Sequence, residues 1–246
     1  MLPSLKSILG KNRMRLEVKN LHVSYGQIPV IRNASLAVSE RQLVCIFGSN
    51  GHGKSTLLKT ICGLVKPSSG SINYGGFDLT PLRVHEIVKR GVVYIPEDRN
   101  LFTGMTVIEN LKLGAYLPHA SRKETENLEA VFSLFPRLAE RKPQIVSTLS
   151  GGELRMLAVG RGLMTDADCL LIDEPSIGLS PLLKTETYHI IGKIKEARGL
   201  TIVLVEQEVR EAMRLADRVY LLKRGEFVFE GIKEELDEAT LKRAFL

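Results

Sequence analysis

The chain of 246 residues lacks tryptophan, has few aromatic residues (6%) and contains only three cysteines. It has no stretch of about 18 uncharged apolar residues, so we expect no membrane-spanning helix. The cysteines, Cys45, Cys62 and Cys169, lie in apolar runs without metal-ligand spacing, which indicates buried thiols in the reducing cytosol. Neither charge sign dominates: 34 basic and 28 acidic residues leave a net charge of +6, which selects no class of partner.

The composition is that of an ordinary globular protein. A hydrophobic content of 44% is enough to build a core, and the absence of a fixed-period repeat excludes solenoids and coiled coils. Residues 1–13 are expected to be a mobile N-terminal extension, the alternative being a weak amphipathic surface anchor formed by Leu2, Leu5, Ile8 and Leu9. No long linker divides the remainder, so residues 14–246 are predicted to form one domain.

The hydrophobic pattern predicts an α/β core with two additions. Short apolar runs predict strands at 16–23, 30–38, 43–47, 71–74, 91–95, 168–173, 201–205, 218–222 and 226–230. Several runs are almost continuously apolar, as in a buried parallel sheet, whereas the first ones alternate and indicate an antiparallel β subdomain. Helical patterns at 106–116, 120–135 and 153–164 predict an inserted helical subdomain over about 100–165. The tail predicts a helix at 208–216, a hairpin turning at Arg224 and Gly225, and a short helix ending at Leu246.

The segment GSNGHGKS, Gly48–Ser55, matches the phosphate-loop pattern and lies between a predicted strand and a predicted helix. Its glycines allow backbone N–H groups to surround phosphates, and the helix N-terminus adds partial positive charge. Lys54 is expected to reach the β- and γ-phosphates, and Ser55 to ligate Mg²⁺.

Two adjacent carboxylates, Asp173 and Glu174, follow the buried run CLLI. Alone, such a pair is more often a helix cap or a solvated edge. Beside a phosphate loop, Asp173 is expected to join the Mg²⁺ shell, and Glu174 to accept a proton from the water that attacks the γ-phosphate.

Between these motifs, Leu149–Glu153 reads LSGGE and precedes an amphipathic helix. Ser150 and Glu153 form a capping box, so the segment can be a well-made helix start. Two successive glycines, Gly151 and Gly152, serve no capping need. They indicate that another group approaches this helix N-terminus closely, as a second phosphate-facing surface would require.

The order of these motifs resembles that in ATP-binding subunits of ABC transporters, whose signature is LSGGQ. The resemblance covers about 14–246 and implies a P-loop NTPase fold: an ABC cassette with a RecA-like parallel core, an antiparallel β subdomain and an inserted helical subdomain. It also implies that two subunits pack head to tail, so that the signature of one closes over the ATP of the other.

The resemblance also assigns roles to single positions. It implies catalytic roles for Glu174, Gln207 and Lys54, with the signature residues Ser150, Gly151, Gly152 and Glu153 acting on the partner's ATP. It implies ATP contacts by Tyr25 against adenine and by Gly48, Ser49, Asn50, Gly51, His52, Gly53, Lys54, Ser55 and Thr56. It implies Mg²⁺ contacts by Ser55, Asp173 and Glu97, and places Ser176–Pro181 against the opposite subunit.

Several positions depart from the usual ABC pattern. Glu97 and Gln207 stand where most members carry glutamine and a switch histidine, which predicts a functional but tuned site. VVYIPEDR, LSGGE and LVEQ together look like the LivF-type subunit of branched-chain amino acid importers. Leu154 and Arg155 replace the glutamines usual in that type, Asp98 replaces glycine, Glu208 replaces asparagine, and Ser180 stands where many members have aspartate.

The implied partners are a second ABC ATPase, identical or different, two integral membrane permeases and, indirectly, an external solute-binding protein; no nucleic acid is expected. The permease is expected to contact Arg99–Phe102, so the chain would lie in the cytoplasm on the inner face of the membrane. The predicted function is ATP hydrolysis that powers import of branched-chain or other amino acids. The alternatives are import of urea, amides or another solute, a non-transport ABC ATPase acting on nucleic acid or ribosomes, and a soluble P-loop kinase.

Overall fold

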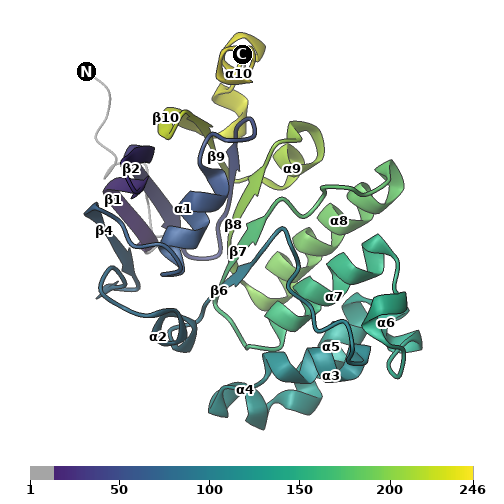
Figure 1. Cartoon of the computed structure of the whole chain (residues 1–246). Coiled ribbons are helices and arrows are strands. Elements are labelled where there is room, and N and C mark those ends of the chain that lie inside the picture. The colour runs from purple at the N-terminus through teal and green to yellow at the C-terminus, as the bar shows by residue number, and fades with distance from the viewer. Residues whose placement is uncertain (1–13, 246) are drawn as a thin grey trace.

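The computed structural model describes residues 14–245, which contain two β-sheets flanked by helices (Figure 1). The predicted surface anchor and mobile extension at 1–13 lie outside the described residues. One sheet has the strand order β10-β9-β3-β8-β7-β6 and the other the order β2-β1-β4-β5. The strands are β1 (Met14–Tyr25), β2 (Ile28–Ser39), β3 (Leu43–Phe47), β4 (Ser69–Tyr74), β5 (Phe77–Asp78), β6 (Val92–Ile95), β7 (Cys169–Asp173), β8 (Thr201–Glu206), β9 (Arg218–Lys223) and β10 (Glu226–Gly231).

The larger sheet is parallel from β9 to β6, with β10 added antiparallel at one edge. All residues of β3, β7 and β8 are buried, which explains their continuous apolar runs. Because the strands are parallel, their carboxyl ends meet at one edge, and the motifs that follow β3, β6, β7 and β8 converge there. The predicted α/β fold with a parallel core is confirmed.

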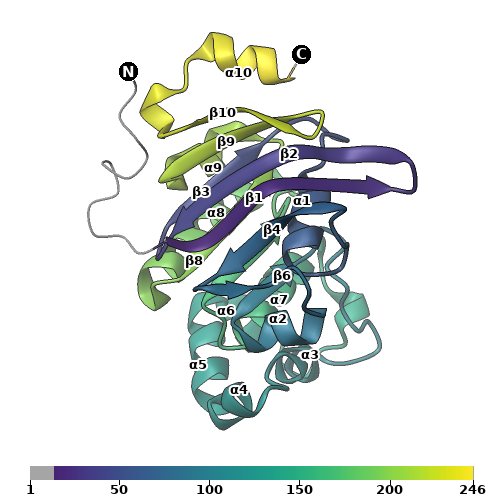
Figure 2. The same cartoon turned by 90° about the vertical axis from the view of Figure 1, so that its left-hand side faces the viewer.

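The smaller sheet is antiparallel and lies beside α1 (Lys54–Ile61), as Figure 2 shows. Its alternating residues Leu16, Val18 and Leu36 are buried and share a core with Leu57 and Leu58 of α1. The short strand β5 at its edge was not predicted from the sequence.

Helices fill the region between β6 and β7. They are α3 (Val107–Gly114), α4 (Pro118–Arg122), α5 (Glu124–Leu134), α6 (Pro136–Glu140) and α7 (Gly151–Leu163), with a 3₁₀ turn at Val146–Thr148. The prediction of one helix over 120–135 is wrong. Lys123 leaves helical geometry (φ −106°, ψ 14°), and its ammonium binds Asp166 at 2.8 Å. Pro118 also starts α4 before the predicted range.

The remaining helices lie beside the parallel sheet, and the last of them lies at the C-terminal end of the chain. They are α2 (Val84–Lys89), α8 (Pro181–Arg198), α9 (Val209–Leu215) and α10 (Glu238–Phe245), with a 3₁₀ turn at Lys233–Glu235. The predicted hairpin turn is confirmed, because Arg224 and Gly225 both have positive φ (50° and 85°). Within 14–245, no helix is long and apolar enough to cross a membrane.

Candidate nucleotide-binding site

The predicted phosphate loop connects the end of β3 to the start of α1. Gly53, at the helix N-cap, has φ 100°, a conformation that glycine adopts without steric cost. The ammonium of Lys54 donates to the backbone oxygens of Gly48 (2.8 Å) and Ser49 (3.3 Å). These bonds fold the side chain back over its own loop, where the predicted phosphates would lie.

Lys54 also forms an ion pair with Glu174, at 2.9 Å between Nζ and Oε1. The two side chains are only 3% and 7% exposed. Each buried charge is therefore stabilised by the other, and removal of one would leave the other buried and unpaired. Glu174 has φ 42°, which is strained for a residue with a side chain, while its N–H donates to the oxygen of Val205 at 3.0 Å. The β8 strand thus holds the predicted catalytic carboxylate in a strained backbone conformation.

Asp173 is held from two sides by hydroxyl groups. Ser55 donates to its Oδ1 at 3.0 Å, and Tyr94 donates to its Oδ2 at 2.6 Å. Burial raises the pKa of Asp173, although these two hydrogen bonds oppose the shift. The hydroxyl of Ser55 and the carboxylate of Asp173 are hard oxygen donors side by side, as a Mg²⁺ site needs.

Glu97 lies at the same edge of the sheet, two residues beyond β6. It lines a hollow of about 350 Å³ together with Lys54 and Glu174. Burial and the nearby carboxylates Glu174 and Asp173 raise the pKa of Glu97. The rest of the lining comprises Val30, Asn50, Gly51, Gly53, Ser55, Thr56 and Ile177. No group of three or more His, Cys, Asp or Glu side chains within 14–245 forms a metal cage, so a metal here would need phosphate or water ligands as well.

A buried carboxylate that the sequence did not single out, Glu206, joins the loops around the site. Its Oε1 accepts from the hydroxyl of Tyr188 (2.6 Å) and the N–H of Ser176 (3.2 Å), and its Oε2 accepts from the N–H of Gln207 (3.1 Å). Burial raises the pKa of Glu206. Gln207 itself is exposed just beyond β8. A lone carboxylate ending an apolar strand was the only sequence signal for Glu206.

The predicted signature segment lies at the start of α7 and does not line the hollow. The capping box is present: Ser150 Oγ accepts from the N–H of Glu153, and Glu153 accepts from the N–H of Ser150 at 2.8 Å. The two glycines of this segment differ in their surroundings. Gly152 is buried against α8, and a Cβ there would lie 2.9 Å from the end of the Leu183 side chain, which would have to shift. Gly151 is exposed and stays open to an approaching group.

Four of the predicted ATP contacts, Tyr25, Gly48, Ser49 and His52, are not among the residues that line the hollow. Tyr25 is 49% exposed at the end of β1, outside the lining of the hollow. Ser49 donates to the oxygen of Phe245 in α10 at 3.3 Å, and the ring of His52 lies 3.2 Å from the oxygen of Leu222. The last two residues hold the phosphate loop against the C-terminal part of the chain.

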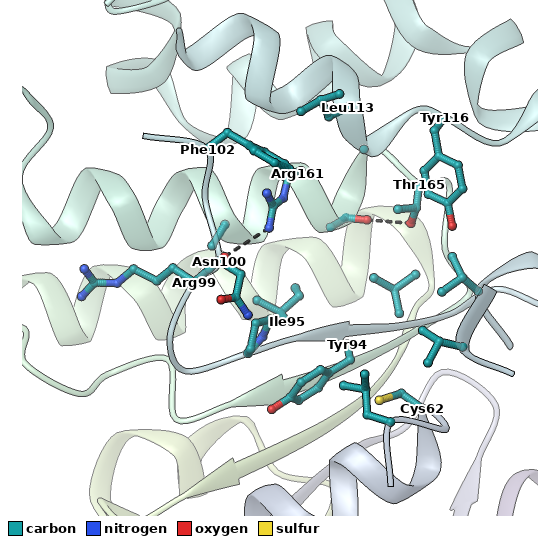
Figure 3. Close-up of a pocket in the computed structure, with 18 residues that line it drawn as sticks. Cys62, Tyr94, Ile95, Arg99, Asn100, Phe102, Leu113, Tyr116, Arg161 and Thr165 are labelled. Carbon is teal, nitrogen blue, oxygen red and sulfur yellow. Dashed lines mark hydrogen bonds between the residues drawn. The ribbon is translucent and has the colours of Figure 1, made fainter. Parts of the chain in front are cut away.

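A second, more apolar groove of about 440 Å³ lies between β6, α3 and α7 (Figure 3). It begins two residues beyond Glu97, with Arg99 and Asn100, and continues to Phe102 and Tyr116, which are 53% and 59% exposed. Arg161 of α7 donates to the oxygen of Arg99 at 3.1 Å and so fixes one wall. Residues of one loop, 96–102, therefore line both the groove and the phosphate hollow.

Comparison with known proteins identifies the family. The profile described as "ABC transporter" matches residues 31–177, which include the phosphate loop, LSGGE and the Asp173–Glu174 pair. The chain belongs to the ABC transporter family. As a member of this family of ATP-binding cassettes, it is an ATPase.

Individual relatives agree with this assignment. The chain is 41% identical to the high-affinity branched-chain amino acid transport ATP-binding protein BraG of Pseudomonas aeruginosa, over 83% of this chain and 87% of the relative. It is 36% identical to the probable branched-chain amino acid transport ATP-binding protein LivF of Archaeoglobus fulgidus, over 91% and 94%. A crystal structure of the ADP conformation of an ABC transporter cassette matches with a TM-score of 0.80 at 26% identity, over 94% of this chain and 98% of that one.

Proposed function

We propose that this chain is the ATP-hydrolysing subunit of an ABC importer for branched-chain or other amino acids. The observation that carries the proposal is the convergence of Lys54, Ser55, Asp173 and Glu174 at one edge of the parallel sheet. The names of relatives such as BraG and LivF support the amino acid part.

In this proposal the phosphates bind in the hollow above the phosphate loop, where Lys54 exchanges its bonds to Glu174 and to loop oxygens for bonds to phosphate oxygens. Glu174, released from that pair, orients a water and accepts its proton. The water oxygen forms a bond to the γ-phosphorus, the bond to the β-phosphate oxygen breaks, and ADP leaves with the electron pair.

Ser55 and Asp173 are the residues that would hold Mg²⁺, with Glu97 beside them. The ion would neutralise charge that develops on the phosphate oxygens. The hydrogen bond between Tyr94 and Asp173 keeps one carboxylate oxygen occupied, so that the other faces Ser55.

The partners in this proposal are a second ABC ATPase and two permease subunits. The signature start of α7 lies outside its own hollow, which fits a role on the ATP of another subunit. The groove at 96–102 combines apolar side chains with the guanidinium groups of Arg99 and Arg161, and suits an amphipathic cytoplasmic helix of a permease that carries an acidic residue. The chain would then lie on the inner face of the membrane.

The test is to express the chain with its chromosomal neighbours, solubilise membranes in mild detergent with Mg-ATP, and identify what copurifies. Two permeases and a second ATPase support the proposal, and uptake of labelled leucine by the reconstituted complex supports the amino acid assignment. Arg99→Glu should abolish permease copurification, whereas Arg210→Glu, an exposed control outside the groove, should not. Recovery only with ribosomes or nucleic acid, or reconstituted export, would overturn the importer.

A further inference from the structure

Arg155 is a buried cation without a carboxylate partner. It lies on α7, four residues beyond Gly151, and is 1% exposed. Its Nη1 donates to the oxygen of Pro96 at 3.2 Å, while Nε and Nη2 have no hydrogen-bond partner among the described residues. A buried guanidinium with two unused donors is costly, so this arrangement favours a nearby acceptor that can reach it.

Four charged groups act on Arg155 at longer range: the guanidinium of Arg99, which repels it, and the carboxylates of Glu97, Glu206 and Asp173, which attract it. Asp173 is occupied by two hydroxyl groups, and Glu206 by Tyr188 and backbone N–H groups. Glu97 has no hydrogen bond or ion pair to any residue in the described part of the chain. It also follows Pro96 directly, the residue whose oxygen Arg155 already holds. Glu97 is therefore the carboxylate that is free to pair with Arg155.

The loop that carries Glu97 has a strained backbone. Arg99 and Asn100 are successive residues with positive φ (63° and 46°), a conformation that is unfavourable for a long side chain such as that of Arg99. The neighbouring Asp98 is exposed. A second arrangement of 97–100 that relieved this strain would let the loop act as a two-state element.

We propose that the Glu97 carboxylate alternates between the phosphate hollow and the Arg155 guanidinium, and that Arg155 thereby competes with Mg-ATP for Glu97. Arg155 is a positioning residue in this proposal, which rests on the proposed function. Because α7 begins at the signature segment, the pairing links the ATP held by this chain to the helix that would face the partner's ATP. Arg161 of α7, whose Nη2 donates to the backbone oxygen of Arg99 at 3.1 Å, adds a second contact between the same loop and α7.

The test is a double-mutant cycle of Arg155 and Glu97. The affinity for Mg-ATP is measured by calorimetry on the full chain, and every variant also carries Glu174→Gln to prevent turnover. Arg155→Gln should tighten Mg-ATP binding about fivefold, because the competing cation is gone, and the effect should vanish when Glu97→Gln is also present. Arg155→Lys, which keeps the charge, should bind more like the parent. Arg137→Met removes an exposed guanidinium from α6, whose ion pair is with Glu140, and should show no coupling to Glu97→Gln.

Equal effects of Arg155→Gln with and without Glu97→Gln, or weaker Mg-ATP binding with Glu97 intact, would overturn the inference. Thermal unfolding of each variant shows whether it is folded, and Arg155→Met provides a second removal of the charge. If the parent chain with Glu174→Gln binds no Mg-ATP, the proposed function fails and the inference fails with it. If Mg-ATP binds normally but Arg155 and Glu97 show no coupling, the role of Arg155 is refuted and the proposed function stands.

Discussion

Lys54 and Glu174, 120 positions apart in the sequence, form a buried ion pair with 2.9 Å between Nζ and Oε1. The pair joins the phosphate loop to the end of β7 and places the phosphate-binding cation on the predicted base. In the proposed mechanism a phosphate that binds Lys54 takes the place of Glu174, so nucleotide binding and release of the base are one event.

Removing the base should separate these two steps. Glu174→Gln keeps the size and one acceptor oxygen, so ATP should still bind, whereas turnover should fall by about 10² to 10⁴. ATP should also hold the variant as a dimer, which light scattering can detect beside a phosphate-release assay. Glu208→Gln, an exposed control beyond β8, should not trap a dimer. Unchanged turnover in Glu174→Gln would remove Glu174 from the base role.

Lys54→Ala should impair both nucleotide binding and stability. It removes the phosphate contact and leaves Glu174 buried without its cation, which typically costs about 3–5 kcal/mol of unfolding free energy. Urea denaturation and Mg-ATP calorimetry measure the two effects separately. Adding Glu174→Gln should restore part of the stability but not the ATP affinity. Wild-type ATP affinity in Lys54→Ala would contradict the phosphate-loop assignment.

The motifs could be predicted from sequence because each lies in one short segment whose spacing carries its chemistry, as Gly48–Ser55 does. The edge of the sheet where these motifs meet could also be predicted, because the apolar runs of β3, β7 and β8 indicate buried parallel strands. Contacts between distant side chains could not be predicted. Nothing in the sequence pairs Tyr188 with Glu206, orients Arg155 toward Pro96, or places the Leu183 side chain beside Gly152.

The buried carboxylate Glu206 should make stability depend on pH. Folding raises its pKa above the usual value of about 4.3, so the folded chain holds this proton to higher pH than the unfolded chain. Its contribution to stability is therefore greatest below the unfolded pKa and is lost as pH rises through the folded pKa. Urea denaturation at increasing pH from about 4.3, the unfolded pKa, should show a shallower decline in Glu206→Gln than in the parent, while the exposed control Glu234→Gln should follow the parent. Parallel curves for Glu206→Gln and the parent would refute this.

Gln207 offers a test of how the site differs from cassettes with a switch histidine. The residue follows β8, and its N–H is held by Glu206 at 3.1 Å, so a substituted side chain should keep the same backbone position. A glutamine amide donates a hydrogen bond at any physiological pH, whereas a histidine titrates near 6.5. Gln207→His should therefore change ATPase activity and add a pH dependence with a midpoint near that value. Gln207→Asn, which shortens the amide without adding a titrating group, should lower activity at all pH values alike. If Gln207→His has the parent's activity and pH profile, the amide does not act on the γ-phosphate.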